Sequence, residues 1–490
     1  MYKCCESAEK IENKFSDFFK IERGVKQGDS LSPTLFNCFI NDLHSVFDST
    51  CDPVCLDTRK INTLSFADDL VILSESAKGL QLALKKLENY CRKWQLTVNI
   101  KKTKILIFGG PSQSNDKFFY KNEFLCEVKE FNFLGNIIDQ KGKFKRSFQE
   151  LSKKGLKAVF SLKKYMADFK HIPVNLSCKL FDALIRPIIL YNSEVWFMDE
   201  YFTFFKALQR SIISGRNFDR LSLVDRCIFE KIHTRFCKSV LGTRKTACNL
   251  AARTELGRLP LEAFIKTQVI TYYSRINSQD INPLVRESLV LNKKLSDDGL
   301  YTWYSFATSI MNDFDLEKTD FEYQNNSFKE VKYKVKNLCK NVIKENYDKL
   351  LLDKISKFDN TSKLHLYSKL KSEIGLSNYL KIPNFNSRKI LTKFRISDHN
   401  LEVELGRYKR IPRDQRHCKV CKVLDDESHF LFHCQINSNL RHIFLNKILN
   451  VYPDFNQLDS FEKIQLILNP DMTVLSFIVD FLKQSLELRK

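Results

Sequence analysis

The tetrapeptide Phe66–Ala67–Asp68–Asp69 constrains this chain more than any other feature, because it joins two short apolar runs, at 64–67 and 70–73. Two apolar β-type runs that meet at so short a polar segment predict a tight β-hairpin. The hairpin would hold two carboxylates in one small volume, where a divalent cation relieves their repulsion. An Asp-Asp pair by itself is more often a solvated turn, because short motifs match often by chance. The flanking strands therefore favour a metal site without excluding the solvated turn.

A polar segment at 23–33, with the sequence RGVKQGDSLSP, precedes the hairpin. Gly24 and Gly28 allow the backbone to approach a ligand closely. Lys26 and Gln27 offer hydrogen-bond donors. From these residues alone, a ligand-binding loop and a plain polar loop before a core helix are equal alternatives.

Pro33 is suited to the first turn of a helix, and the apolar stretch 35–40 suits a buried helix. Ser30 or Ser32 is expected to cap its N-terminus. After the hairpin, a second helix is predicted, with a cationic face made of Lys85, Lys86, Arg92 and Lys93 and an apolar face made of Leu80, Leu84, Leu87, Cys91 and Trp94.

Strand character resumes at 96–99 and 105–108 and again in a stretch that ends at Phe133–Leu134–Gly135. From about 141 to 385 the pattern is mostly helical, with lysine-rich amphipathic segments at 145–165 and 327–358. Around 386, short β-like pieces are expected before a Cys/His cluster, and one or two helices are expected after it. We therefore predict domain boundaries at residues 140, 215, 385 and 450.

The Cys/His cluster has the spacing Cys418-x2-Cys421-x7-His429-x4-Cys434. Two cysteines two residues apart form half of a tetrahedral zinc site, and a His and a Cys a short loop later can complete it. Four protein ligands leave no open position, so the predicted role is structural. His433 and His417 are rivals for His429, but each neighbours a ligand cysteine and would point away; four unrelated groups are the other alternative. The remaining groups, which lack complete ligand sets, are interpreted as ordinary residues: Cys4 and Cys5; Cys51 and Cys55; Cys227, His233 and Cys237.

Charge gives a second indication of function. The chain has 79 Lys and Arg against 58 Asp and Glu, a formal net charge of +21. A polyanionic partner, by default nucleic acid, would offset this self-repulsion, although lysines that merely solvate helix faces are an alternative. The sequence shows no run apolar enough to span a membrane and no secretory signal at its start. Its 15 cysteines do not show the paired pattern of a disulfide-bonded protein, which favours reduced thiols in the cytosol or nucleus.

Five ordered blocks between residues 24 and 135 together resemble the palm of reverse transcriptases. They are the G-V-x-Q-G-D-x-L-S-P block, the F-A-D-D hairpin, the helix that ends at Trp94, an N-x-x-K-T segment and the F-L-G turn. The resemblance implies that Asp68 binds catalytic Mg²⁺ and that Asp69 supports the site. It also implies that Gln27 and Gly28 line the template and nucleotide pocket, that Lys102 lies near the triphosphate, and that Phe133, Leu134 and Gly135 form the primer grip.

The downstream chain resembles the non-LTR, LINE-type branch of that family, and jockey-like elements in particular. The stretch 190–196, LYNSEVW, is similar to a block that follows their palm, and Trp196 is also expected to pack a helical core. The stretch Glu255–Arg258 resembles a later block. The cluster resembles their terminal zinc knuckle, whose basic surroundings would bind RNA or target DNA: Arg407, Lys409, Arg410, Arg413 and Arg416.

The resemblance implies an α+β chain with a partial right-hand polymerase palm, made of an antiparallel sheet plus helices, over 1–140. A helical thumb (141–215), a helical connector (216–385), a zinc-knuckle region (386–450) and C-terminal helices (451–490) would follow. The palm of the family also contains a third carboxylate in an upstream motif. Only 23 residues precede Gly24, and the neighbours of Asp17 do not fit that motif.

We therefore expect an N-terminally truncated RNA-directed DNA polymerase with little activity by itself. Its parent form would use Mg²⁺, dNTPs, an RNA template and a DNA primer or target. The alternative is a non-catalytic RNA- or DNA-binding protein derived from a retrotransposon. A group II intron or telomerase-type function fits less well, because LYNSEVW and the terminal cluster favour LINE elements.

Overall fold

The structure is a computed structural model, and it describes residues 6–12, 14–21, 24–26, 28–56, 59–109, 116–168, 172–213, 220–278, 280–322, 327–359, 362–471 and 473–489. The chain forms two compact units. Unit 1 consists of Met1–Lys143 with Pro283–Lys294, and unit 2 consists of Phe144–Asn282 with Leu295–Lys490. The finer division at 140, 215, 385 and 450 stays a prediction.

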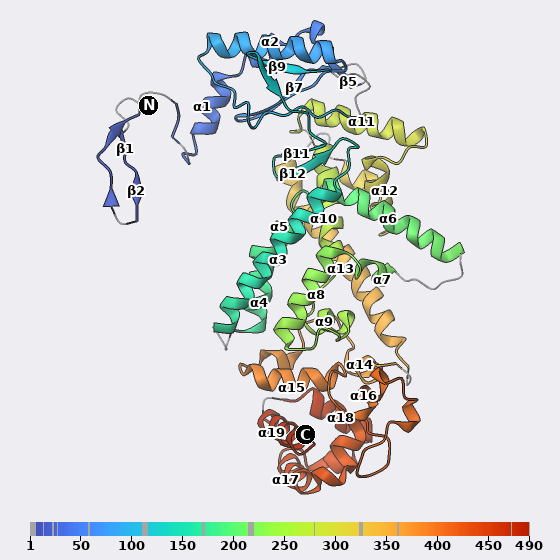
Figure 1. The fold of residues 1–490 in the computed structure, drawn as a ribbon. Helices are drawn as coiled ribbons and strands as arrows, with labels where there is room; N and C mark the ends of the chain where they lie inside the picture. The colour runs from blue at the N-terminus through green and yellow to red at the C-terminus, as the bar shows by residue number, and fades with distance from the viewer. Residues whose placement is uncertain are drawn as a thin grey trace. The chain divides into compact units, whose positions relative to one another are not determined.

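The strands of unit 1 pair antiparallel, and in the described residues each ladder contains two strands (Figure 1). The fold therefore combines helices with small antiparallel sheets, and no larger palm sheet forms among the described residues. The ladders are β1 (Glu6–Ser7) with β4 (Phe19–Lys20), β2 (Lys10–Ile11) with β3 (Lys14–Phe15), β5 (Val54–Leu56) with β6 (Arg59–Ile61), β7 (Thr63–Phe66) with β8 (Asp69–Ile72), β9 (Phe118–Tyr120) with β10 (Glu123–Leu125), and β11 (Glu130–Phe133) with β12 (Asn136–Asp139).

The core of unit 1 forms on one face of α2 (Ala77–Lys93), where the apolar period of the sequence predicted it. Leu84, Leu87 and Cys91 are buried there, and Leu80 and Trp94 pack against them. The Ser76 side chain caps the helix by accepting a hydrogen bond from the backbone N–H of Gly79. Ile105, residues of β9 and β10, and buried side chains between Ile40 and Cys51 also belong to this core.

Three expectations for unit 1 are wrong. The stretch 35–40 was expected to form a buried helix, but Leu35 and Phe36 are only partly buried and Phe39 is 43% exposed. Residues 96–99 and 105–108 form no strand; Ile105 makes a single parallel bridge to Glu127. Their apolar side chains pack against the core of unit 1, so burial alone accounts for the apolar pattern. The helix α1 (Ser32–Phe39) has Pro33 in its first turn as expected, but no serine caps it. The Ser32 hydroxyl instead donates to the carbonyl oxygen of Lys26, at 2.5 Å.

A distant segment also belongs to unit 1. Residues Pro283–Lys294, most of α11 (Pro283–Asp297), lie within it. Arg59 on β6 forms an ion pair with Glu287 on this helix, at 2.7 Å, and both side chains remain substantially exposed. Such a pair contributes little to stability, because water screens it.

Unit 2 is helical, as the amphipathic periodicity predicted. The predicted segment 145–165 is α3 (Lys145–Asp168), and 327–358 is α13 (Phe328–Ser356). The others up to residue 370 are α4 (Val174–Leu180), α5 (Arg186–Ile189), α6 (Ser193–Ile213), α7 (Arg220–Val224), α8 (Ile228–Leu241), α9 (Asn249–Glu255), α10 (Leu261–Ile276), α12 (Trp303–Asn312) and α14 (His365–Leu370). None of the helices in the described part of the chain is both long and apolar enough to cross a membrane.

Aromatic side chains fill much of the core of unit 2. Trp196 on α6 is buried, as predicted, and contacts Phe148 on α3 and Phe229 on α8. Its indole N–H donates to the carbonyl oxygen of Tyr191, at 2.7 Å, so its polar atom is also satisfied. The LYNSEVW stretch therefore contributes Trp196 to the core of unit 2.

Charged side chains are also buried in unit 2. Arg395 on α15 (Phe385–Arg395) pairs with Glu255 on α9 at 3.0 Å, and both side chains are almost fully buried. Arg395 also donates to the carbonyl oxygen of Leu468, at 2.8 Å, and to the Asn469 side chain. This guanidinium therefore joins α9, α15 and the end of α18 (Ser460–Leu468).

A second buried network lies between α8 and the segment before α10. His233 Nδ1 and Glu230 Oε1 are 2.9 Å apart, and the Arg258 Nε–H donates to His233 Nε2 at 2.7 Å. Since Nε2 accepts a hydrogen bond, the Nδ1–H donates to Glu230 and the imidazole is neutral. Burial lowers the pKa of His233 below its usual value, which agrees with this tautomer.

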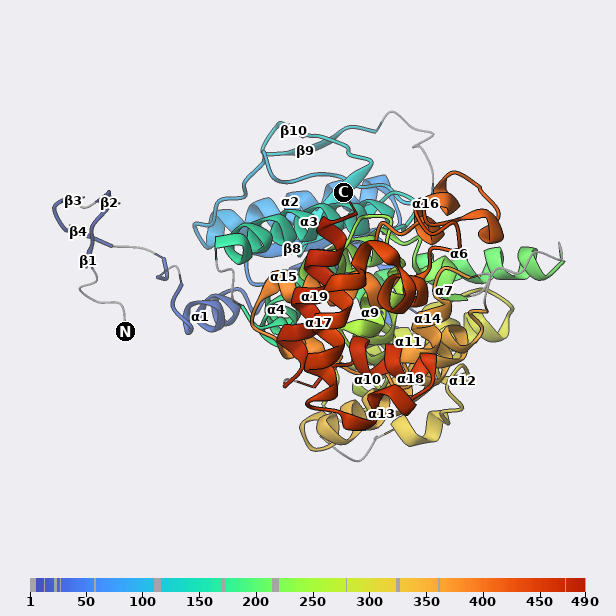
Figure 2. The ribbon, with the colours of Figure 1, turned by 90° about the horizontal axis from the view of Figure 1, so that it is seen from below.

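The segment after residue 385 is helical where short β-like pieces were expected. Helices α15 and α16 (Glu402–Tyr408) precede the Cys/His cluster. Helices α17 (Ser438–Leu449), α18 and α19 (Leu475–Glu487) follow it, and α17 and α19 lie side by side in Figure 2. Phe444 and Phe481 stack between these two helices, with ring centroids 4.5 Å apart.

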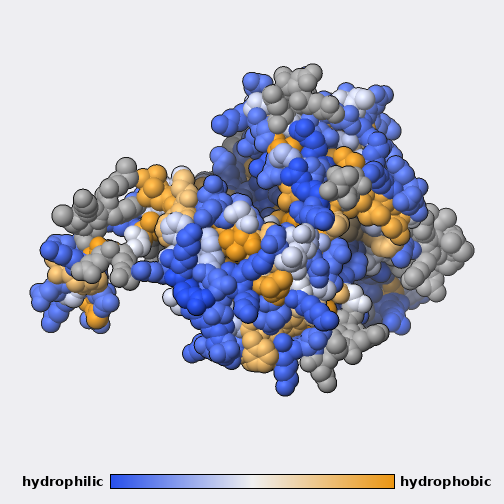
Figure 3. Space-filling view, turned by 90° about the horizontal axis from the view of Figure 1, so that it is seen from above, coloured by the Kyte–Doolittle hydropathy of each residue, from blue (hydrophilic) through white to orange (hydrophobic). Residues whose placement is uncertain are grey.

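The face of the molecule in Figure 3 is mostly hydrophilic, with hydrophobic side chains in separate patches. Many of the exposed polar side chains are lysines, which is consistent with the net charge of +21. Scattered apolar groups are normal on folded proteins, and they do not by themselves indicate an interface.

Candidate functional site

The predicted hairpin at the Asp-Asp pair is present. β7 and β8 pair antiparallel, and Phe66 lies opposite Asp69, so Ala67 and Asp68 form a two-residue turn. Ala67 has a φ of 51°, in the left-handed region. A residue with a Cβ adopts this region at a cost of about 1 kcal/mol. The turn places Asp68 at the tip and Asp69 at the first position of β8.

Both carboxylates are exposed. Among the described residues, neither side chain has a hydrogen-bond or ion-pair partner, whereas Leu70 and Ile72, farther along β8, pack against the core of unit 1. The hairpin is therefore anchored by its apolar residues, and its two acids remain available for a cation. Adjacent, unpaired carboxylates are typical oxygen ligands for Mg²⁺.

The loop before α1 has the conformation that its glycines permit. Gly24 and Gly28 have φ values of 89° and 84°, and no atom lies within 4 Å of a Cβ built on either residue. Glycine is thus needed here for backbone conformation and leaves open space beside the chain. The Asp29 carboxylate accepts a hydrogen bond from the backbone N–H of Leu31, at 3.0 Å, which holds the loop at the start of the helix. Gln27 lies outside the described residues.

Lys102 lies in a turn that Asn99 organises. The Asn99 side chain and carbonyl oxygen both accept from the backbone N–H of Lys102, at 3.2 and 3.1 Å, and the Thr103 hydroxyl donates to the same carbonyl oxygen at 3.0 Å. The Lys102 side chain is exposed. In the described part of unit 1, no hydrogen bond or ion pair joins the side chain of Asp68 or Asp69 to Gly28, Lys102 or Phe133.

Phe133, Leu134 and Gly135 form a second tight hairpin turn. Phe133 pairs with Asn136, so Leu134 and Gly135 are the two central residues between β11 and β12. Both have positive φ, 47° and 82°. This is the pattern of a type I′ turn, which suits the twist of a hairpin. The sequence located this turn but did not reveal its type.

The four predicted zinc ligands converge in unit 2. The ligand atoms of Cys418, Cys421, His429 and Cys434 all lie within 4.8 Å of one another, and the Sγ atoms of Cys421 and Cys434 are 4.0 Å apart. Sulfur atoms about 2.3 Å from one Zn²⁺ would be roughly 3.8 Å apart in a tetrahedron. The side chain of His429 is buried, and its Nε2 has no hydrogen-bond partner. A buried, unpartnered imidazole nitrogen beside three sulfurs fits a zinc ion.

Local backbone structure explains how the first half of the cluster forms. The Cys418 N–H donates to the carbonyl oxygen of Val423 at 2.8 Å, and the Lys422 N–H donates to that of Cys418 at 2.9 Å. Lys422 has a φ of 59°, which closes the turn tightly. Cys418 and Cys421 therefore lie on opposite arms of one small loop, and both can reach the same point.

A π-helical turn at His429–His433 forms the second half. The Cys434 N–H donates to the carbonyl oxygen of His429 at 2.8 Å, an i→i+5 hydrogen bond. Residues five apart on a regular α-helix are about 140° apart around its axis. The wider turn brings them closer to one face, so that His429 and Cys434 both reach the cluster.

Groups outside the ligand set also contact the cluster. Arg489, beyond α19, donates through Nη2 to Cys434 Sγ at 2.8 Å and through Nη1 to Asp425 Oδ1 at 2.7 Å. The Gln435 N–H donates to Cys421 Sγ at 3.3 Å. Sequence reasoning missed Arg489 and Asp425. No local signal could have revealed Arg489, because it lies 55 residues from Cys434.

These surroundings shift the acidity of the ligands. Burial raises the pKa of the Cys434 thiol, but the hydrogen bond and charge of Arg489 outweigh it, so that the net shift is downward. Burial lowers the pKa of His429, which favours the neutral imidazole. Thiolate and neutral imidazole are the forms that bind Zn²⁺.

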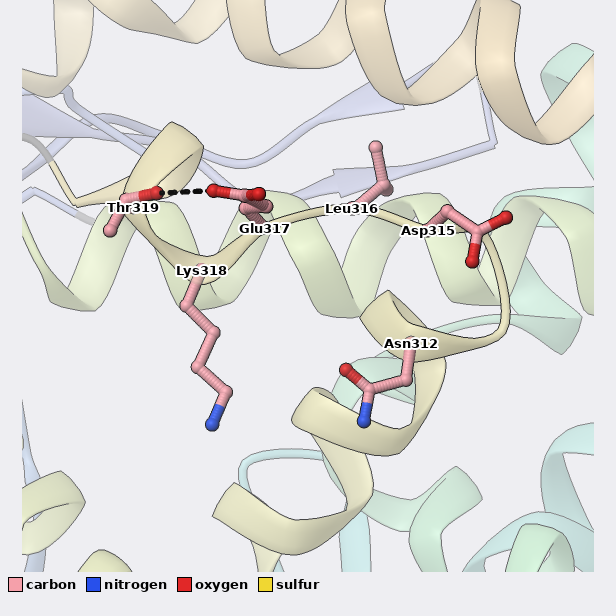
Figure 4. Close-up of a pocket in the computed structure, with 6 residues that line it drawn as sticks. All are labelled: Asn312, Asp315, Leu316, Glu317, Lys318 and Thr319. Atoms are coloured by element: carbon pink, nitrogen blue, oxygen red, sulfur yellow. Dashed lines mark hydrogen bonds between the residues drawn. The ribbon is translucent and has the colours of Figure 1, made fainter.

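Other polar groupings do not form comparable sites among the described residues. Cys227, His233 and Cys237 are buried in the core of unit 2, and their ligand atoms do not converge as those of the cluster do. An open pocket at the end of α12 contains none of the predicted site residues. Figure 4 shows that Asn312 of α12 and the segment 315–319 line it, with the Thr319 hydroxyl directed at the Glu317 carboxylate. We assign no function to this pocket.

Comparison with known proteins identifies the N-terminal segment. A family described as reverse transcriptase (RNA-dependent DNA polymerase) matches residues 1–138. The chain is 22% identical over 193 residues to the RNA-directed DNA polymerase from the mobile element jockey of Drosophila melanogaster, covering 38% of this chain and 20% of that protein.

Elements of the R2 type are also similar. The chain is 31% identical over 232 residues to the retrovirus-related Pol polyprotein from a type-1 retrotransposable element R2 of Popillia japonica, covering 44% of this chain and 29% of the relative. A similar protein of Nasonia vitripennis is 46% identical over 67 residues, 14% of this chain and 6% of the relative. The chain thus spans less than a third of the length of these curated relatives. Residues 1–138 match the reverse-transcriptase family, and the chain is a relative of the RNA-directed DNA polymerases of non-LTR retrotransposons.

Proposed function

We propose that this chain is part of an RNA-directed DNA polymerase of a non-LTR retrotransposon and that its hairpin turn contributes to the catalytic metal site. The observation that carries the proposal is the position of Asp68 and Asp69. Asp68 lies at the tip of the two-residue turn and Asp69 is the first residue of β8. Neither has a side-chain partner among the described residues, and both lie inside the segment that matches reverse transcriptases. Bound Mg²⁺ would supply the charge that activates a primer 3′-hydroxyl and neutralises the leaving pyrophosphate.

In this proposal unit 1 supplies part of a polymerase palm, and the first helices of unit 2 supply a thumb. Asp68 binds the metal, and Asp69 supports it. Gln27 and Gly28 contact the template and nucleotide, the Lys102 ammonium attracts the triphosphate, and residues 133–135 grip the primer. Two features support these roles. The left-handed Gly28 leaves open space beside the backbone, and the type I′ turn places the backbone of residues 134–135 at the tip of a hairpin.

The metal site can be tested without measuring polymerase activity. The full chain is loaded with Fe²⁺ in place of Mg²⁺ and treated with ascorbate and peroxide, so that hydroxyl radicals cut the backbone near bound iron. We expect cleavage close to residue 68 that excess Mg²⁺ suppresses and that Asp68→Asn with Asp69→Asn abolishes. Glu75→Gln, an exposed acid on the same segment, is the matched control. Cleavage near residue 68 that persists in the double variant, or that is absent from the unaltered chain, would overturn the metal assignment.

Primer extension then separates catalysis from binding. The substrate is a DNA primer on an RNA template with dNTPs and Mg²⁺. Incorporation that Asp68→Asn removes would support catalysis by this chain. Absence of incorporation, with the template–primer still bound, would support a second candidate function.

That second candidate is non-catalytic binding of RNA or DNA, and the net charge of +21 favours it. Phosphate contacts release counterions, so the affinity for a polynucleotide should fall steeply with salt. We expect at least a tenfold loss between about 50 and 200 mM salt, measured by fluorescence anisotropy, which corresponds to a few phosphate contacts. A flat response would exclude an electrostatic nucleic-acid surface.

We further propose that Cys418, Cys421, His429 and Cys434 hold a structural Zn²⁺ ion. The convergence of their ligand atoms within 4.8 Å supports the proposal. The metal would stabilise the segment between α16 and α17, and arginines in that segment and on α16 would contribute to nucleic-acid binding. With four protein ligands, the site has no position for a substrate.

A further inference from the structure

The C-terminal end of the described chain contacts the Cys/His cluster through a single side chain. Arg489 donates from Nη2 to Cys434 Sγ at 2.8 Å and from Nη1 to Asp425 Oδ1 at 2.7 Å. Its guanidinium also lies over the ring of Phe430, 4.8 Å from the ring centroid. Only 12% of the Arg489 side chain is exposed. An arginine side chain with three such contacts is held in one geometry.

All three contacts involve residues that lie within the segment spanned by the four ligands, 418–434. Asp425 lies between Cys421 and His429 in the sequence, and Phe430 follows His429 directly. The second carboxylate oxygen of Asp425 accepts from the backbone N–H of Glu402 at 2.9 Å, in the first turn of α16. The Arg489 side chain therefore connects the cluster, α16 and the end of α19 through one carboxylate.

Electrostatics gives this arginine a role at a metal site. A Zn²⁺ ion with three thiolates and one neutral imidazole carries a net charge of −1, and a buried charge is unfavourable unless it is paired. The Arg489 guanidinium is a permanently charged donor on one of the three sulfurs. Donors to metal-bound groups orient the ligands and tune their affinity for the metal.

We propose that Arg489 is a positioning residue for the zinc site, and that zinc retention is thereby coupled to docking of the segment after α19. Arg489 is not a metal ligand; it neutralises the cluster and fixes the orientation of Cys434. The inference rests on the structural zinc site proposed above. The effect of zinc should be local, because Phe481 stacks on Phe444 at 4.5 Å and holds the body of α19 without the metal.

The rate of zinc release tests this role directly. The full chain, loaded with one equivalent of Zn²⁺, is mixed with an excess of a chromophoric chelator, and the transfer of zinc is followed. We expect release from Arg489→Gln to be roughly 10- to 100-fold faster than from the unaltered chain, the range for loss of a group that orients a metal ligand. Arg489→Lys, which keeps the charge but loses the forked geometry, should lie between the two. Lys483→Gln, which removes an exposed charge from α19, the helix that precedes Arg489, should match the unaltered chain.

Hydrogen exchange supplies a second readout. Zinc removal from the unaltered chain should raise amide exchange in residues 484–489 and leave residues around Phe481 unchanged. In Arg489→Gln, exchange at 484–489 should be raised even with zinc bound. A far-UV circular dichroism spectrum checks folding, and Arg489→Lys carries the test if the Gln variant fails to fold.

The outcomes separate the two proposals. If the unaltered chain binds no zinc, the zinc site itself is wrong. If it binds zinc and both Arg489 variants release it at the unaltered rate, the zinc site stands and the role of Arg489 is overturned. Equal exchange at 484–489 with and without zinc would overturn the coupling to the C-terminal segment.

Discussion

The two candidate metal sites of this chain contrast in how completely the fold assembles them. In unit 2, four ligand atoms converge, three of the four ligand residues are buried, and Arg489 and Gln435 donate to their sulfurs. In unit 1, Asp68 in the hairpin turn and Asp69 at the start of β8 are exposed, and neither side chain has a partner among the described residues. The first site is organised without its metal. The second presents two ligands and depends on further groups and on the cation.

The difference reflects where each site obtains its ligands. All four ligands of the cluster lie within 17 residues, so a small loop and one helical turn suffice to bring them together. The proposed polymerase site would collect groups from several strands and loops, and the hairpin would be only one of them. Metal removal should therefore affect the fold at the cluster and activity at the hairpin.

The largest expected effect is the loss of the zinc ligands. Cys418→Ser with Cys434→Ser should reduce bound zinc from one ion per chain to none, measured by plasma mass spectrometry, and should unfold the segment around the cluster. Structural zinc supplies about 10–16 kcal/mol of apparent binding free energy in zinc-finger peptides at neutral pH. Cys227→Ser with Cys237→Ser is the matched control and should retain zinc. Full zinc in the first variant would show that other groups bind it.

A smaller but still large effect is expected where a buried ion pair joins helices. Arg395→Met leaves Glu255 buried without its partner, which should lower the free energy of unfolding by about 3–5 kcal/mol. Arg59→Met, at the exposed pair with Glu287, should change it by less than about 1 kcal/mol. Denaturant titrations of both variants measure the difference. Similar losses of unfolding free energy in the two variants would contradict the burial of the Arg395–Glu255 pair.

The buried His233 should make unit 2 less stable in mild acid. Its folded pKa is lowered by burial, so below about pH 6.5 the unfolded chain binds a proton that the folded chain does not. The contribution of His233 to the free energy of unfolding is therefore fully present above this pH. It is lost as the pH falls towards the folded pKa, by up to about 1.4 kcal/mol per pH unit. Unfolding titrations between pH 7.5 and 5 should show a steeper decline for the unaltered chain than for His233→Asn. Parallel declines would show that other groups cause it.

The smallest effect on stability is expected at the hairpin. Asp68→Asn should change the free energy of unfolding by less than about 0.5 kcal/mol, because the carboxylate is exposed and unpartnered. The same substitution should abolish cation-dependent cleavage near the turn. A loss above about 2 kcal/mol in thermal or denaturant unfolding would show that Asp68 serves the fold, and the contrast between the two sites would disappear.

Local patterns in the sequence predicted the local geometry of both candidate sites. The apolar runs around Asp68 predicted the hairpin, and the cysteine spacing predicted the four convergent groups. The 3.6-residue period predicted α2, α3 and α13, because each buries one apolar face. In each case the relevant residues lie within a few turns or strands of one another, where sequence spacing determines geometry.

Tertiary contacts accounted for what the sequence did not reveal. Residues 96–99 are apolar because they pack against the core of unit 1, and this burial was mistaken for strand character. The helices α15 and α16 were missed, although α15 is held by the long-range pair of Arg395 with Glu255. Arg489 and Pro283–Lys294 were unforeseeable for the same reason, since their contacts involve residues far away in the sequence.

The π-helical turn at His429–His433 bears on how this region tolerates changes in length. An i→i+5 turn accommodates one more residue than a regular α-helical turn, and residues four apart on an α-helix already share a face. A His-x3-Cys spacing on an α-helical turn and a His-x4-Cys spacing on a π turn therefore present the same two ligands to one point. A one-residue deletion inside this turn can therefore be absorbed by a change from π-helix to α-helix, with no displacement of the ligands. Relatives whose spacing differs by one residue are thus best aligned with the gap inside the turn and with His429 and Cys434 kept in register.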